Sequence, residues 1–155
     1  MTDKWTIISY NGNVCSSYIK KGVLFLTRIS EADRDIFEQA LYLPMILTIL
    51  QRDRMIIEKS PLKLKRPYIQ LIDKTTEFVQ QELAEIKRYM KKKQMKIQRV
   101  KSDDTFTMYV FFYKGYEEKH NYFNPRLRNR TEELLTFYLF ERYTDQAIHP
   151  LQQHE

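Results

Sequence analysis

The sequence predicts an α+β fold that is mainly helical, with a long antiparallel helical hairpin, a β-hairpin and a C-terminal helix. Two long stretches, residues 31–58 and about 67–94, carry apolar residues at helical spacing. Residues 105–114 alternate instead with a period of two, which is typical of a strand. The chain has 155 residues and only three glycines. We therefore expect one ordered domain, over residues 26–143, with a core of its own.

Ser30 is the expected N-cap of the first helix, which we place at residues 31–58, because acidic side chains follow it in the first turn. Pro44 removes a backbone hydrogen bond inside this helix, so we expect a kink one turn earlier, near Ala40. The helix should end before Pro61, since a proline disfavours the helical conformation of the residue that precedes it.

Pro67 has the place of a first-turn proline in the second helix, which extends to about Gln94. One side of this helix carries an apolar stripe, whose members follow each other at intervals of three and four residues. They are Tyr68, Ile72, Thr75, Val79, Leu83, Ile86 and Met90. Packing the stripe against the first helix, across the 59–66 loop, gives an antiparallel hairpin, and burial in the core is the favoured interpretation. Such a long stripe also offers apolar surface to a second copy of the chain. Its candidate self-association seam is Tyr68, Ile72, Val79, Leu83, Ile86 and Met90.

A β-hairpin is predicted next, with residues 96–101 as its first arm, Ser102–Asp104 as its turn and residues 105–114 as its second arm. In the second arm, one face carries Phe106, Met108, Val110 and Phe112, and the other carries Thr105, Thr107, Tyr109, Phe111 and Tyr113. A helix through residues 105–122 is the alternative. We then expect an irregular aromatic stretch up to Asn124–Pro125, followed by a last helix that Thr131 caps.

The first 25 residues differ from the body, because they hold two of the three glycines, the only cysteine and the only tryptophan. The codons that can encode Lys20–Val23 include a purine-rich string resembling a ribosome-binding site, and Leu26 follows at a spacing that suits a TTG start codon. One hypothesis is therefore that residues 1–25 are a translated leader. The other is an ordinary N-terminal arm. At the opposite end, residues 144–155 are expected to form a polar tail.

No catalytic, cofactor or metal signature is complete in this sequence, so we expect no enzyme activity. Glu117–His120 has the Glu-x-x-His spacing of di-iron ligands, but such sites need the motif twice, and His120 is interpreted as a solvated loop residue. Asp103 and Asp104 belong to the predicted turn rather than to an acid–base pair. The glycines form no phosphate-binding loop. The sequence predicts no cofactor, no metal and no small-molecule substrate.

Binding surfaces have more support, since the net charge of +6 and the pI near 9.3 permit acidic partners. Basic residues gather where the second helix meets the hairpin and again before the last helix. The candidate nucleic-acid or anion surface is Lys91, Lys92, Lys93, Lys96, Arg99, Lys101, Arg126, Arg128 and Arg130. The candidate stacking or interface aromatics are Tyr109, Phe111, Tyr113, Tyr116, Tyr122 and Phe123. The simpler interpretation is a solvated lysine face, with the aromatic side chains packed between hairpin and helices.

The predicted function is a non-enzymatic protein-interaction module, with a homodimer as the first expectation and nucleic acid as the alternative partner. The single cysteine, Cys15, allows no intrachain disulfide, which is typical of proteins of the reducing cytoplasm. The longest apolar run, Ala40–Leu50, is shorter than the roughly 20 residues of a membrane helix, so no membrane partner is expected.

Three phrases carry a resemblance to a known family: ALYLPMILTIL, SPLKLKRPYIQLI and YKGYEEKHNYFNPRLRNRTEELL. They resemble the YhjD-like group of small proteins from Bacillus-type Firmicutes, over about residues 26–143. The resemblance implies a cytoplasmic protein of a Gram-positive bacterium. It implies no activity, cofactor or catalytic residue.

Overall fold

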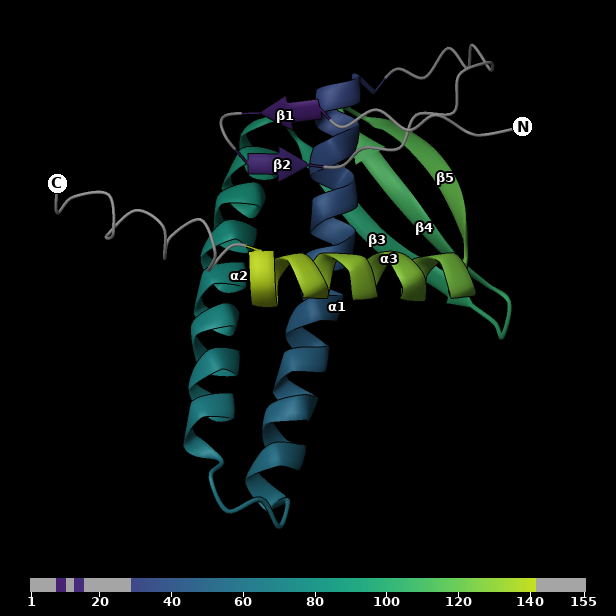
Figure 1. Ribbon diagram of the computed structural model, residues 1–155. Helices are drawn as coiled ribbons and strands as arrows, with labels where there is room; N and C mark the ends of the chain where they lie inside the picture. The colour runs from purple at the N-terminus through teal and green to yellow at the C-terminus, as the bar shows by residue number, and fades with distance from the viewer. Residues whose placement is uncertain (1–7, 11–12, 16–28, 142–155) are drawn as a thin grey trace, which may run out of the picture.

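A long helical hairpin carries a three-stranded antiparallel sheet in the computed structural model, which describes residues 8–10, 13–15 and 29–141 (Figure 1). The hairpin consists of α1 (Glu31–Lys59) and α2 (Arg66–Lys92). The sheet pairs β3 (Met95–Ser102), β4 (Phe106–Tyr113) and β5 (Tyr116–Phe123) in sequence order. The prediction of an α+β, mainly helical fold is confirmed.

Two further elements and two short strands complete the described chain. Helix α3 (Asn124–Thr136) continues into the π-helical segment η1 (Phe137–Glu141) and crosses both long helices (Figure 1). Strands β1 (Ile8–Tyr10) and β2 (Asn13–Cys15) form a separate antiparallel pair. The remaining residues of the predicted leader or arm, and the predicted polar tail, lie outside the described residues.

Local signals set the ends of α1, as predicted. The Ser30 hydroxyl accepts a hydrogen bond from the backbone N–H of Asp33 at 3.2 Å, which caps the first turn. At the other end, the N–H of Ser60 donates to the carbonyl of Ile57 at 3.2 Å, and the helix ends at Lys59, before Pro61. Pro44 lies inside the helix.

The turn between β3 and β4 is also the predicted one. The Asp103 carboxylate accepts hydrogen bonds from the backbone N–H groups of Thr105 and Phe106, at 2.8 and 2.7 Å. A second tight turn follows β4, where Lys114 and Gly115 have φ of 48° and 85°. Gly115 adopts that left-handed conformation without steric cost, and the chain reverses into a third strand.

Strand β5 corrects the sequence prediction, which placed an irregular stretch after the β-hairpin. The reason is that β5 is an edge strand whose sequence does not alternate clearly between apolar and polar residues. One of its faces carries Tyr116, His120 and Tyr122 with a glutamate between them, and the other carries two charged residues, an asparagine and a phenylalanine. Charged side chains are common on an edge strand, where they discourage pairing with another chain.

The start of the last helix is a second correction. Helix α3 begins at Asn124, with Pro125 in its first turn, rather than at Thr131. Phe123 occupies the cap position and has no polar side chain to signal the start. Thr131 lies inside the helix, where its hydroxyl donates to the carbonyl of Leu127 at 2.7 Å.

The core lies between the two long helices and the sheet. Phe37 of α1 is fully buried, and its ring stacks on Phe111 of β4 with a centroid distance of 4.4 Å. The apolar stripe of α2 faces α1, so its buried members are Ile72, Thr75, Val79, Leu83, Ile86 and Met90. Tyr68, at the loop end, is 54% exposed. The favoured interpretation of the stripe as core is therefore correct, and five of the six seam residues are covered within one chain.

Candidate functional site

The sheet has an inner face toward α1 and an outer face on the opposite side. Tyr109, Phe111 and Tyr113 belong to the inner face and are at most 8% exposed. Their rings are covered by the core, so these three predicted stacking residues do not line an open surface. Tyr122 is half-buried on the same side, where its hydroxyl donates to Glu38 of α1 at 2.7 Å.

The register of the three strands defines which residues make up the outer sheet face. Phe112 lies between Lys96 and Glu117, Val110 between Gln98 and Lys119, and Met108 between Lys101 and Asn121. Phe106 pairs with Phe123 at the end of the sheet, with ring centroids 5.6 Å apart. The outer sheet face therefore consists of Lys96, Gln98, Lys101, Phe106, Met108, Val110, Phe112, Glu117, Lys119, Asn121 and Phe123.

This face combines apolar and basic side chains on one surface. Phe106 and Phe123 are 40% and 46% exposed, Met108 and Phe112 are half-buried, and Val110 is 5% exposed. The ammonium group of Lys96 lies 5.7 Å from the centroid of the Phe112 ring, within cation–π range. Of the predicted aromatics, only Phe123 belongs to this face, while Tyr116 is 50% exposed at the turn. The sequence places these four apolar residues of β4 on one face, but it does not show that this face points outward.

The structure does not bring the two predicted basic clusters onto one face. Lys91, Lys92 and Lys93 are exposed at the end of α2, and Lys96 and Lys101 continue onto the outer sheet face. Arg99 has inner-face register and lines a groove of about 250 Å³ between α1 and the sheet. The arginines lie within α3 rather than before it, and the charges of Arg126 and Arg130 act on Glu38, on the inner side. Arg128 is exposed, and Arg130 pairs with Glu133 at 2.8 Å.

A cluster of ionisable groups lies between the N-terminal half of α1 and the sheet. The Asp33 carboxylate is buried and accepts hydrogen bonds from the hydroxyls of Tyr89 and Tyr113, at 2.9 and 2.8 Å. Burial alone would raise its pKa, but these bonds, the Ser30 hydroxyl and the charge of Lys93 together hold the pKa below its ordinary value. Asp33 is thus a satisfied, ionised group that joins α1, α2 and β4.

Glu38 has the opposite behaviour, because burial raises its pKa and outweighs the Tyr122 hydrogen bond and the nearby arginines. Burial and the adjacent Glu38 charge raise the pKa of Tyr122 in turn. Burial lowers the pKa of His120, which the neighbouring Glu118 only partly offsets. Carboxyl and imidazole groups with shifted pKa values are the usual candidates for proton transfer.

The surroundings of His120 argue for a structural role. His120 lies in β5 rather than in a loop, and its ring stacks on Phe111 with a centroid distance of 4.2 Å. Its Nε2 lies 3.4 Å from a Glu118 carboxylate oxygen and is shielded from solvent. Neither the groove beside Arg99 nor a second groove near the hairpin loop is lined by Glu38, His120 or Tyr122. The cluster therefore has shifted pKa values but borders neither groove in which a substrate could lie.

Glu38→Gln is expected to raise the free energy of unfolding at neutral pH. The folded chain raises the pKa of Glu38 above 4.5. The stability that the protonated carboxyl contributes is therefore fully present below pH 4.5 and is lost as the pH rises through the folded-state pKa. A neutral amide avoids the cost of a buried charge, and its carbonyl can still accept from Tyr122. Urea unfolding at several pH values measures this. A Gln variant that is less stable at neutral pH would contradict it.

Comparison with known proteins agrees with the resemblance noted in the sequence. The family model described as YhjD protein matches residues 28–143. The chain is 45% identical over 115 residues to "Uncharacterized protein YhjD" of Bacillus subtilis (strain 168), an alignment that covers 74% of this chain and 96% of that relative. No solved structure matches the chain. The chain therefore belongs to the YhjD protein family.

Proposed function

We propose that this chain is a non-enzymatic protein-interaction module that self-associates through the outer sheet face. The observation that carries the proposal is the composition of β4, whose four outward residues are Phe106, Met108, Val110 and Phe112. An antiparallel sheet with one solvated face normally places polar residues outward, whereas a strand apolar on both faces is typical of a covered sheet. The known helices lie on the inner side, so a second copy would supply the cover.

The charges at the edges of the outer sheet face suit a two-fold contact. Lys96 on β3 and Glu117 on β5 flank Phe112 from opposite sides. In a symmetric dimer, the same surface meets itself, and Lys96 of one copy can face Glu117 of the other. Such rim pairs contribute little affinity but fix the register, while the apolar centre supplies most of the binding energy.

The test is the molar mass of the full chain, measured by light scattering or sedimentation over a range of concentrations. We expect a dimer, and we expect Phe112→Lys to weaken it by about 30-fold or more, since an apolar anchor of an interface typically contributes about 2 kcal/mol or more. Leu62→Lys is the matched control, because it places the same charge at an exposed apolar residue in the hairpin loop. A monomer at all concentrations, or equal weakening by both variants, would overturn the proposal.

The alternative partner, single-stranded nucleic acid, is favoured by one observation on the same face. Lys96, Lys101 and Lys119 lie beside Phe106, Phe112 and Phe123, an arrangement in which bases can stack on rings while lysines contact phosphates. Repeating the mass measurement with a mixed oligonucleotide at low and moderate salt distinguishes the two. A complex that dissociates as salt rises, and that Lys96→Glu removes, would assign the face to nucleic acid.

A further inference from the structure

The loop end of the helical hairpin is a second surface with exposed apolar side chains, separate from the outer sheet face. We call residues 52–68 the hairpin tip. Five of its apolar side chains are at least 47% exposed, namely Met55, Ile56, Leu62, Leu64 and Tyr68, with Leu64 the most exposed at 77%. Figure 1 shows the tip at the end of the molecule opposite the sheet. Dimerisation through the outer sheet face would therefore leave the tip free.

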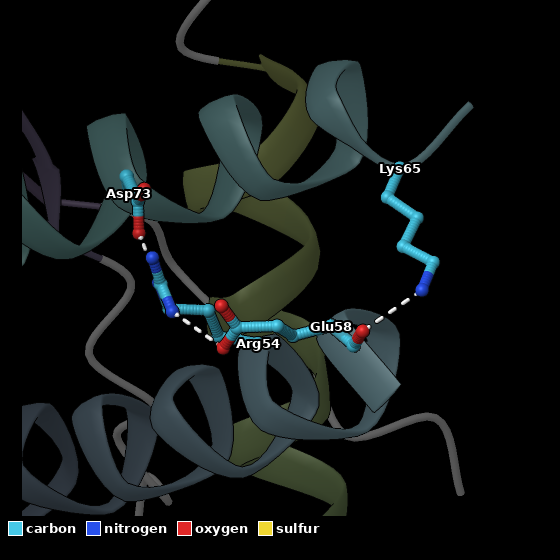
Figure 2. Close-up of polar contacts among 4 residues, drawn as sticks. All are labelled: Arg54, Glu58, Lys65 and Asp73. Atoms are coloured by element: carbon cyan, nitrogen blue, oxygen red, sulfur yellow. Dashed lines mark hydrogen bonds and ion pairs between the residues drawn. The ribbon is translucent and has the colours of Figure 1, made fainter. Parts of the chain in front are cut away.

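Polar contacts hold the tip in one shape (Figure 2). Arg54 of α1 bridges the two helices, because its Nε donates to Asp73 of α2 at 2.8 Å and its Nη1 to Glu58 at 3.1 Å. Lys65 donates to the backbone carbonyl of Glu58 at 2.9 Å and so ties the end of the loop to the end of α1. The exposed leucines between these contacts are thus presented on a braced loop, and the exposure is not the result of a loose chain.

The charge of the tip is strongly positive. Residues 52–68 carry six basic and two acidic side chains, a net charge of +4. Arg54 pairs with one of the acids, Glu58, and the other, Asp53, is half-buried beside the groove between α1 and α2. Lys59, Lys63 and Arg66 are exposed and form no ion pair within the part of the chain that the structure describes.

We propose that the hairpin tip docks on an anionic lipid surface. Leu62 and Leu64 enter the boundary between headgroups and acyl chains, while Lys59, Lys63 and Arg66 contact the lipid phosphates. The alternation of leucine and lysine suits this boundary, because lysine stems can lie along apolar surface while the ammonium groups remain at the headgroups.

The contact is peripheral. Among the described residues, no helix is long and apolar enough to cross a membrane. The sequence-based expectation of no membrane partner rests on the length of the longest apolar run, which bears on a spanning helix and not on a braced loop that touches one leaflet.

Other occupants fit the tip less well. A two-fold contact between two tips would bring two surfaces of net charge +4 together, which repel each other. Nucleic acid would satisfy the charge, but four of the five exposed apolar side chains of the tip are not aromatic, and Tyr68 alone offers a ring on which a base could stack. An anionic lipid surface satisfies both the positive charge and the exposed aliphatic side chains.

The experiment is co-sedimentation of the full chain with vesicles of phosphatidylcholine alone, or of phosphatidylcholine mixed with phosphatidylglycerol. We expect binding to the anionic vesicles only, weaker at higher salt. Leu64→Asp should weaken it by at least about tenfold, because it replaces an inserting side chain with a charge of the wrong sign, and Leu64→Trp should strengthen it. Since Leu64 is 77% exposed, both variants should retain the thermal stability of the parent chain.

A matched pair of charge reversals separates docking by the tip from general electrostatic adsorption. Lys63→Glu and Lys92→Glu change the net charge equally, but Lys92 is exposed at the far end of α2. Only Lys63→Glu should weaken vesicle binding, by about fivefold. Equal weakening by both, or binding that Leu64→Asp leaves unchanged, would overturn the proposal. So would a dimer that Leu64→Asp dissociates, because the tip would then serve a second copy.

Discussion

Replacing Phe37 with alanine is expected to lower the free energy of unfolding by about 3–5 kcal/mol. The Phe37 side chain is fully buried, and its ring stacks in parallel on Phe111 at 4.4 Å. This pair joins α1 to the central strand of the sheet, so the cavity would open where two layers of the core meet. Neighbouring side chains on a helix and a paired strand can relax only partly to fill such a space.

Urea unfolding followed by circular dichroism measures this loss directly. The matched control is Met55→Ala on the same helix, where the side chain is 48% exposed and the expected change is about 0.5 kcal/mol or less. If the slope of the free energy of unfolding against urea concentration is unchanged, the substitution has lowered the stability without changing the surface area that unfolding exposes. A loss below about 1 kcal/mol for Phe37→Ala would mean that the α1–sheet contact is not the centre of the core.

The helical hairpin could be predicted from the sequence because its determinants are local. Ser30, Pro61 and Pro67 mark the ends of α1 and α2 through capping and through the restrictions that proline imposes on its neighbours. The stripe of α2 then identifies the face that must be covered. Each of these signals acts within a few residues, so no knowledge of the tertiary structure is needed.

The candidate surface could be predicted only in part. Both faces of β4 are apolar, and the tertiary structure decides which of them α1 covers. The alternation of β4 correctly separated its residues into two faces. Both faces carry aromatic side chains, and the sequence does not say which one α1 covers. Tyr109, Phe111 and Tyr113 are candidates for stacking in the sequence, but the structure places them in the core, in agreement with the simpler interpretation of packed aromatic side chains, and leaves Phe106 and Phe112 on the outer side.

The hairpin tip illustrates a different limit. Its leucines and lysines are visible in the sequence, but such a loop is ordinarily flexible, and scattered exposed apolar residues need no explanation. What distinguishes it is the bridge from Arg54 to Asp73, 19 residues apart along the chain, and the tie from Lys65 to the end of α1, and the local sequence pattern reveals neither contact. The exposed leucines become informative only once the loop is known to be braced.

Asp33→Ala is the second change with a large expected effect, a loss of about 2–5 kcal/mol. The substitution leaves the hydroxyls of Tyr89 and Tyr113 without their acceptor in a site that is closed to solvent. These tyrosines lie 56 and 80 residues from Asp33 along the chain. The loss would therefore loosen the contact of α1 with both α2 and β4 at the same point.

The pH dependence identifies the ionised carboxylate as the source of this stability. Because the folded chain holds the pKa of Asp33 below 3.8, the contribution is present above that pH and is lost as the pH falls through the folded value. Asp33→Asn keeps the size of the side chain and removes the charge, so its stability should depend less on pH in the acid range. It should remain less stable than the parent chain at neutral pH, since an amide nitrogen cannot accept from a hydroxyl.

Tyr89→Phe and Tyr113→Phe complete the test, because each removes one hydroxyl and leaves the ring in place. Each should cost about 1.5–3 kcal/mol, the range for a hydrogen bond to a charged group, and neither should add its full cost to that of Asp33→Ala. If the costs were additive instead, the three side chains would act independently. The stability that Asp33 provides would then have a source other than these two hydrogen bonds.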